Sequence, residues 1–206
     1  IIGRGAEKYA MYVKGLELPA HDPRRAKAFG LSMVTSPIGA SHTMGISTFE
    51  EFGVPYKGKK VDPFTTEGKG EIAKYMQDET AAYETGIWCI FVASFCGIPL
   101  ELYAKLLRAA TGIKEFNAQY LLLVGERIFN LERVINAREG IDASYDKMPE
   151  RISSEAISRD DTPARGQVFE EKIMIKDYYK ARGWNENGIP TKEKLKELGL
   201  EDYFSK

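Results

Sequence analysis

The sequence has few of the residues from which disulfide frameworks and self-contained metal sites are built. Its 206 residues include two cysteines, two histidines and two tryptophans. Two cysteines seven positions apart do not suggest a disulfide framework, so we expect a reducing, cytoplasmic environment. Two histidines are too few for a self-contained His-rich metal site. No apolar run approaches the roughly 20 residues of a membrane span, so no membrane partner is expected.

An excess of charge of either sign is also lacking. Lys and Arg together number 29 and Asp and Glu together number 30, which gives a formal net charge of -1. Because there is neither a basic field nor an acidic tail, no nucleic-acid partner is expected. With 43% hydrophobic and 29% charged residues, the chain has the composition of a globular protein that buries a core, as one large domain or two small ones.

Apolar residues recur at helical spacing through most of the chain, and no alternating pattern predicts strands. The expected helices cover residues 5–14, 25–34, 69–83, 100–111, 117–138 and 170–181, with a short last helix after residue 191. The helix over 117–138 has the broadest apolar surface and is the expected central packing element. Residues 142–166 are polar and predict a long loop. The predicted fold class is all-α, an irregular multi-helix domain with long loops.

Both cysteines lie in one apolar and aromatic stretch, with an acidic residue five positions before the first of them. Two interpretations of this stretch are open. In the first, Glu84 caps or solvates a helix start, while Cys89 and Cys96 share one helical face and act as small core residues. In the second, Cys89 is a ligand of a metal cluster and Glu84 contacts a cofactor. The residues of the stretch alone do not decide between them.

His42 lies among small residues in the irregular segment 35–42. Small neighbours let the backbone approach a ligand closely. The residues alone favour a histidine that forms hydrogen bonds within its own loop.

Five segments carry a resemblance when they are taken together and in order. Residues 14–24 match the pattern K-G-L-E-x-P-x-x-D-P-R, and residues 35–42 match T-S-x-R-G-A-x-H except at Ile38. Residues 61–64 lead into the helix before Cys89. Residues 125–140 match G-E-R-I-x-N-L-E-R followed by N-x-R-E-G, and residues 178–184 match Y-Y-x-x-R-G-W. Over nearly its whole length the chain resembles the C-terminal α-helical region of the tungsten-dependent aldehyde:ferredoxin oxidoreductase family.

The resemblance implies a tungsten (or molybdenum) ion held by the dithiolenes of two pterins, beside a [4Fe-4S] cluster. In the family's D-x-x-G-x-C motif the acid binds one pterin and the cysteine is the fourth cluster ligand. Cys89 matches that cysteine, Glu84 stands in place of the aspartate, and Ile87 stands in place of the glycine. His42 matches a histidine close to the metal. Cys96 has no matching role and is expected in the core.

The remaining cluster ligands are missing from this sequence. A [4Fe-4S] cluster takes four thiolates, and in the family the other three cysteines belong to an N-terminal part. The chain also opens without an initiator methionine. We therefore expect residues 1–206 to be the C-terminal region of a longer protein, or a separate subunit, that packs against an N-terminal cofactor-binding part. Homo-oligomerisation is left open.

The implied reaction is oxidation of an aldehyde to a carboxylic acid, with electrons passed through the cluster to ferredoxin. Two alternatives are retained. One is a benzoyl-coenzyme A reductase-type catalytic subunit of the same superfamily, for which the departures at Glu84 and Ile38 leave room. The other is a non-catalytic helical interaction or assembly domain, in which Cys89 would be packed in a dry core.

Overall fold

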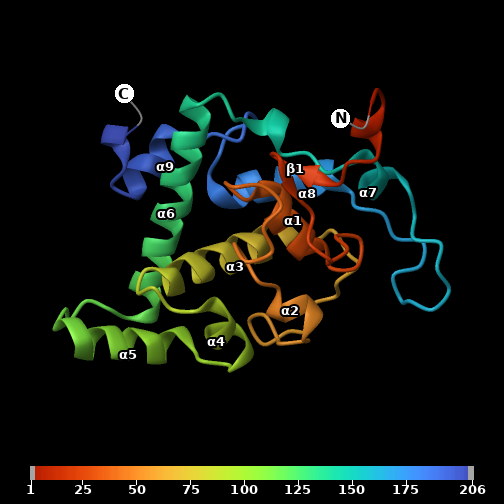
Figure 1. Ribbon diagram of the computed structural model, residues 1–206. Helices are drawn as coiled ribbons and strands as arrows, with labels where there is room; N and C mark the ends of the chain where they lie inside the picture. Colours follow the sequence, from red (N-terminus) through yellow and green to blue (C-terminus); the bar gives the residue numbers. More distant parts are fainter. Residues whose placement is uncertain (1–2, 204–206) are drawn as a thin grey trace.

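Helix α3 (Lys69–Glu84) runs through the middle of the molecule in the computed structural model, which describes residues 3–203 (Figure 1). Three helices pack around it: α1 (Lys27–Thr35), α6 (Ala118–Arg138) and α8 (Glu171–Arg182). The other helices are α2 (Thr48–Glu51), α4 (Ile90–Phe95), α5 (Leu100–Thr111), α7 (Glu150–Ser154) and α9 (Lys192–Glu197). The mainly helical class predicted from the sequence is confirmed. Ile1 and Ile2, at the chain start discussed above, lie outside the described residues.

The long helix predicted over 117–138 is confirmed as α6, and its start follows from local chemistry. The Asn117 side chain accepts a hydrogen bond from the backbone N–H of Tyr120 at 2.8 Å, which caps the first turn. Gly140, with φ 81°, follows the end of the helix as predicted. The last helix is capped in the same way, because Thr191 accepts a hydrogen bond from the N–H of Lys194.

Two glycines let the central helices approach each other closely. A Cβ atom on Gly125 of α6 would overlap the carbonyl oxygen of Asp78 on α3. A Cβ on Gly70 of α3 would likewise meet the backbone of Asp177 on α8. The glycine of the G-E-R segment therefore sets the distance between α3 and α6, which together carry the acidic residues of the candidate site.

The helix predicted over residues 5–14 is wrong. Residues Ala6–Lys8 form a single 3-10 turn (η1), and the chain then makes a hairpin of β1 (Tyr12–Val13) and β2 (Leu16–Glu17). Lys14 and Gly15 connect the strands with φ angles of 49° and 81°, which is the backbone of a two-residue hairpin turn. The helical spacing of four apolar residues was coincidental, and a tertiary contact of Lys14 decides the local structure.

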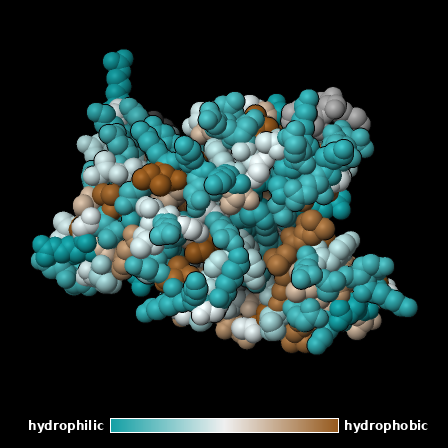
Figure 2. All heavy atoms as spheres, turned by 180° about the vertical axis from the view of Figure 1, so that it is seen from behind, coloured by the Kyte–Doolittle hydropathy of each residue, from teal (hydrophilic) through white to brown (hydrophobic). Residues whose placement is uncertain are grey.

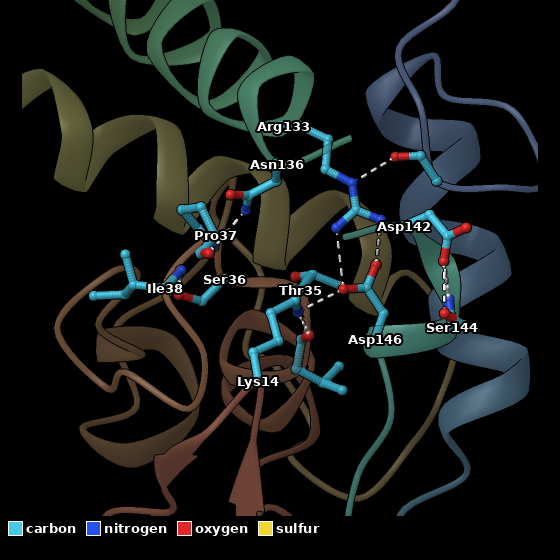
Figure 3. A network of polar contacts seen from close by, with 12 residues as sticks. Lys14, Thr35, Ser36, Pro37, Ile38, Arg133, Asn136, Asp142, Ser144 and Asp146 are labelled. Carbon is cyan, nitrogen blue, oxygen red and sulfur yellow. Dashed lines mark hydrogen bonds and ion pairs between the residues drawn. The ribbon is translucent and has the colours of Figure 1, made fainter. Parts of the chain in front are cut away.

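That contact is a buried ionic network around Asp146, which follows the 3-10 turn η2 (Ala143–Tyr145) (Figure 3). Lys14 Nζ lies 2.5 Å from Asp146 Oδ1, and Arg133 of α6 donates to both carboxylate oxygens, at 3.1 and 2.7 Å. Tyr179 of α8 donates its hydroxyl to Oδ2 at 2.5 Å. One carboxylate thus joins the hairpin, α6, α8 and the loop that was predicted over 142–166.

Among residues 3–203, no helix combines the length and the apolar character needed to cross a bilayer.

Candidate functional site

The segment that follows α3 places both cysteines at the surface. Cys89 immediately precedes α4, Cys96 immediately follows it, and both thiols are free and exposed. The prediction that Cys96 lies in the core is wrong, and so is the core interpretation of Cys89. It assumed one continuous helix through both residues, whereas α4 covers only the six residues between them.

Aromatic side chains gather at the short helix between the two thiols. Phe91 and Phe95 of α4 stack with ring centroids 5.5 Å apart, and Phe52 meets Phe95 edge-on at 5.4 Å. Each of the three is about half exposed. We call Phe52, Phe91 and Phe95 the aromatic surface. Seen from behind, more hydrophobic side chains gather on the lower right, at the end of the molecule that α5 forms (Figure 2). Apolar patches of this kind mark surfaces that another body covers.

Ile87 has a left-handed backbone conformation. Its φ is 57° and its side chain is 97% exposed. A β-branched residue in this left-handed region is strained, whereas glycine is not. The position is the one for which the family motif has a glycine. Ile87 therefore preserves the shape of the turn between Glu84 and Cys89 at a cost in stability.

We predict that Ile87→Gly stabilises the chain by about 0.5–1 kcal/mol. Relief of the left-handed strain, roughly 1–2 kcal/mol, exceeds the entropy cost of a flexible glycine. No burial is lost, since the side chain is almost fully exposed. The measurement is urea unfolding of the variant beside the wild type, with Ile87→Ala as the control that keeps a Cβ. A loss of stability in Ile87→Gly would show that the Ile87 side chain packs usefully.

Glu84 has an acidic neighbour that the sequence did not reveal. Glu84 ends α3, and partial burial raises the pKa of its carboxyl. Glu132 lies on α6, and its pKa rises to about 6, first because of burial and then because of the charge of Glu84; Arg182 opposes the rise. Glu132 Oε2 is buried and has no hydrogen-bond partner within residues 3–203. A carboxylate oxygen without a partner is costly, and a polar ligand would satisfy it.

Glu132 was not singled out from the sequence, because charged residues on an amphipathic helix usually face solvent. One signal was present. Glu132 follows Gly125 by seven positions and Phe129 by three, which places it on the helix face that packs against the core. Phe129 and Gly125 are indeed buried.

We predict that Glu132→Gln stabilises the chain above pH 6. The folded pKa of about 6 lies above the ordinary 4.5. The Glu132 carboxyl therefore loses its proton at lower pH in the unfolded chain than in the folded chain. As a result, the free energy of unfolding falls as pH rises between these two values. At pH 7 the substitution should raise the free energy of unfolding by about 1 kcal/mol, a value discounted for solvent screening. Urea unfolding at pH 4 and pH 7 measures the difference, with the exposed Glu139→Gln as control. An effect of equal size at both pH values would contradict the explanation.

His42 lies in the segment between α1 and α2 and is half-buried. Its ring stacks on that of His21, with centroids 5.4 Å apart and planes inclined by 29°. Burial lowers the pKa of His42, the neighbouring His21 lowers it further, and Glu51 opposes both effects. The imidazole of His42 is therefore neutral at pH 7. His21 and Glu51 were not singled out from the sequence, because only the fold brings them to His42.

Helix α6 and the hairpin hold the start of the His42 segment in place (Figure 3). Asn136 of α6 donates its side-chain amide to the carbonyl oxygen of Pro37 at 2.8 Å, and Lys14 donates to the carbonyl oxygen of Val34 at 2.6 Å. Ile38, which stands where the family pattern has arginine, is more than half exposed. Three of the matching sequence segments thus meet at one place, and their shared task is to anchor the histidine segment.

The three predicted site residues do not form one cluster within the described part of the chain. No hydrogen bond, ion pair or ring contact among residues 3–203 joins His42 to Glu84 or Cys89. No group of three or more His, Cys, Asp or Glu side chains in that range could by itself hold a metal ion. Glu84 instead has Glu132 of α6 as a neighbour, and His42 has His21.

The exposed thiol of Cys89 thus lies on a mainly helical scaffold, and the comparisons with known proteins show the family of that scaffold. Residues 1–200 match the family model described as aldehyde ferredoxin oxidoreductase, domains 2 and 3, and the chain therefore belongs to the aldehyde ferredoxin oxidoreductase family.

Several related proteins are named as tungsten-containing aldehyde ferredoxin oxidoreductases of Pyrococcus species. The chain is 37% identical to a tungsten-containing aldehyde ferredoxin oxidoreductase of Pyrococcus furiosus over 97% of its own length, and 38% identical to that of Pyrococcus horikoshii over 96%. It is 27% identical to the WOR-like subunit of an aliphatic sulfonate oxidoreductase of Pyrococcus furiosus. The chain spans 32% of the length of the two aldehyde ferredoxin oxidoreductases.

A solved structure has the same fold. It is the active-site complex BamBC of benzoyl coenzyme A reductase with 1,5-dienoyl-CoA, with a TM-score of 0.71 and 22% sequence identity. The match covers 98% of this chain and 35% of the other. It supports the mainly helical fold of this chain.

Proposed function

We propose that this chain is the C-terminal helical region of a tungsten-pterin, iron-sulfur oxidoreductase that oxidises an aldehyde to a carboxylic acid and passes the electrons to ferredoxin. The observation that carries the proposal is Cys89. It is an exposed, unpaired thiol beside the aromatic surface, at the position where the family motif has its cluster ligand. Two exposed free thiols also favour a reducing, cytoplasmic location.

The residues present fit the expected cofactors. The thiol of Cys89 would ligate the [4Fe-4S] cluster, and the carboxyl of Glu84 would accept hydrogen bonds from one pterin. The unpartnered Oε2 of Glu132 supports a polar ligand on this side, because a donor group from the pterin would satisfy it. When bound, the metal-pterin centre supplies the two-electron oxidation and the cluster supplies one-electron transfer to ferredoxin.

The rest of the chemistry that this chain contributes lies with His42. One aldehyde and one water give one carboxylic acid, two protons and two electrons. A neutral imidazole can donate a hydrogen bond to the carbonyl oxygen through its N–H, or take up a released proton on its other ring nitrogen. The lowered pKa of His42 supports this role, because it keeps one nitrogen free to accept.

The other half of the site must come from an N-terminal part of the same polypeptide or from a partner subunit. A [4Fe-4S] cluster takes four thiolates, and this chain has two cysteines. The aromatic surface is the face that such a part would cover, excluding water around Cys89. The greater identity to the aldehyde ferredoxin oxidoreductases favours this function over the benzoyl coenzyme A reductase alternative.

Thiol labelling tests the proposal against a non-catalytic interaction domain. In the Cys96→Ser background, Cys89 should react with a maleimide at nearly the rate of an unfolded thiol when the chain is alone, and should be strongly protected in the assembled enzyme. The matched Cys89→Ser chain reports Cys96 alone and corrects for general shielding. A Cys89 that reacts slowly in the lone chain would indicate a dry core and favour the interaction domain.

A further inference from the structure

Two residues outside the proposed machinery act on the His42 ring: His21 stacks on it, and Glu51 contacts His21. His21 lies in the connection between β2 and α1, and Glu51 is the last residue of α2. His21 Nδ1 lies 3.0 Å from Glu51 Oε1, and the His21 ring stacks on His42 at 5.4 Å. On its other side, the His21 ring meets the buried Phe29 edge-on at 5.2 Å. The chain's two histidines are therefore in contact, although they are 21 positions apart.

This arrangement restrains the His42 ring in orientation and in charge. A carboxylate that accepts the Nδ1–H of an imidazole fixes which ring nitrogen carries the proton and how the ring is turned. Because the two rings are stacked, a proton on His21 disfavours a proton on His42. His21 and Glu51 are the charged groups that act on His42, with opposite signs.

We propose that His21 and Glu51 are positioning residues for His42. Glu51 orients the His21 ring, and the His21 ring holds the His42 ring by stacking. The inference rests on the proposed function only for the role of His42 in turnover. The coupling of the three side chains belongs to this chain alone.

The test is an NMR titration of the imidazole nitrogens in the histidine-labelled chain, which has two histidines and so two sets of signals. In His21→Phe the ring is kept and the charge is lost. The pKa of His42 should rise by about half a unit, the size of the interaction between two charges 5.4 Å apart in a water-like medium. In Glu51→Gln it should fall, since the opposing charge is removed.

Shifts of opposite sign distinguish charge coupling from mere packing. If His21 only fills space beside Phe29, His21→Phe leaves the His42 titration unchanged, and the proposal is overturned. The exposed Glu17→Gln controls for general charge effects and should shift nothing. If His21→Phe does not fold, as judged by circular dichroism, the Glu51→Gln titration decides alone, and an unchanged His42 there also overturns the proposal.

Turnover of the complete enzyme separates this inference from the proposed function. His42→Ala should lower turnover while metal content stays unchanged, and His21→Phe should move the acidic limb of the kcat/KM profile upward by the same half unit that NMR measures. Full turnover in His42→Ala would overturn the proposed role of His42 and leave the coupling intact. A normal pH profile in His21→Phe, with His42→Ala inactive, would overturn only the positioning role.

Discussion

Cys89→Ser should remove most of the iron and nearly all electron transfer to ferredoxin from the complete enzyme. A serine hydroxyl is a far poorer cluster ligand than a thiolate, because it does not ionise near neutral pH. Cys89 is exposed and outside the core, so the substitution leaves the helical scaffold folded. Iron per polypeptide and reduction of ferredoxin by the aldehyde-treated enzyme measure the two effects.

Cys96→Ser is the matched control for this experiment. Its thiol is equally free and exposed, on the other side of the same short helix, but it has no counterpart in the family motif. Iron content and electron transfer should be unchanged in Cys96→Ser. Intact iron with full activity in Cys89→Ser would end the assignment of Cys89 as a cluster ligand. Equal losses in both variants would indicate general damage to the α4 surface.

Asp146→Ala should destabilise the chain by roughly 3–5 kcal/mol. The substitution leaves two buried cations, Lys14 and Arg133, without their shared carboxylate. Burial already lowers the pKa of Lys14 against the opposing effect of Asp146, so Lys14 should lose its proton more readily in the variant. The free energy of unfolding in urea at pH 7 measures the loss.

Asp142→Ala is the matched control, four residues away in the same loop. Its carboxylate accepts hydrogen bonds from the backbone N–H and the hydroxyl of Ser144, at 2.9 and 2.7 Å (Figure 3), and its loss should cost at most about 1 kcal/mol. A loss of less than about 1 kcal/mol in Asp146→Ala would show that the network is not a main support of the fold. Loss of Asp146 would also affect the segment that carries His42, because Lys14 donates a hydrogen bond to the carbonyl oxygen of Val34 near the end of α1.

Sequence periodicity predicted α5 and α6 because each buries only part of its residues and leaves the others in solvent. The ends of α5 and α6 follow from Pro99, Gly112, Asn117 and Gly140, whose backbone preferences are local. The hairpin at Lys14 was missed, since a buried partner 132 positions away decides its structure. The surface position of Cys96 was missed for a related reason: seven-residue spacing places residues on one face only while the helix continues.

The candidate site likewise contains residues that local sequence indicated and residues that only the fold brings together. Glu84, Cys89 and His42 could be selected from the sequence, because they lie in segments that match family motifs. Glu132, His21 and Glu51 could not, because their relevance comes from contacts across helices and loops that no local pattern specifies. The Glu132 carboxyl and the paired imidazoles are features of the folded chain, and both lie beside residues that the motifs had already indicated.

Elemental analysis for tungsten, molybdenum and iron, on the anaerobically purified complete enzyme that contains this chain, tests the central claim most directly. We predict tungsten together with about four iron atoms per copy of this chain, the content of one [4Fe-4S] cluster. We also predict loss of the iron in Cys89→Ser. Absence of both tungsten and iron from a folded, complete preparation would contradict it and leave the helical chain as an interaction domain.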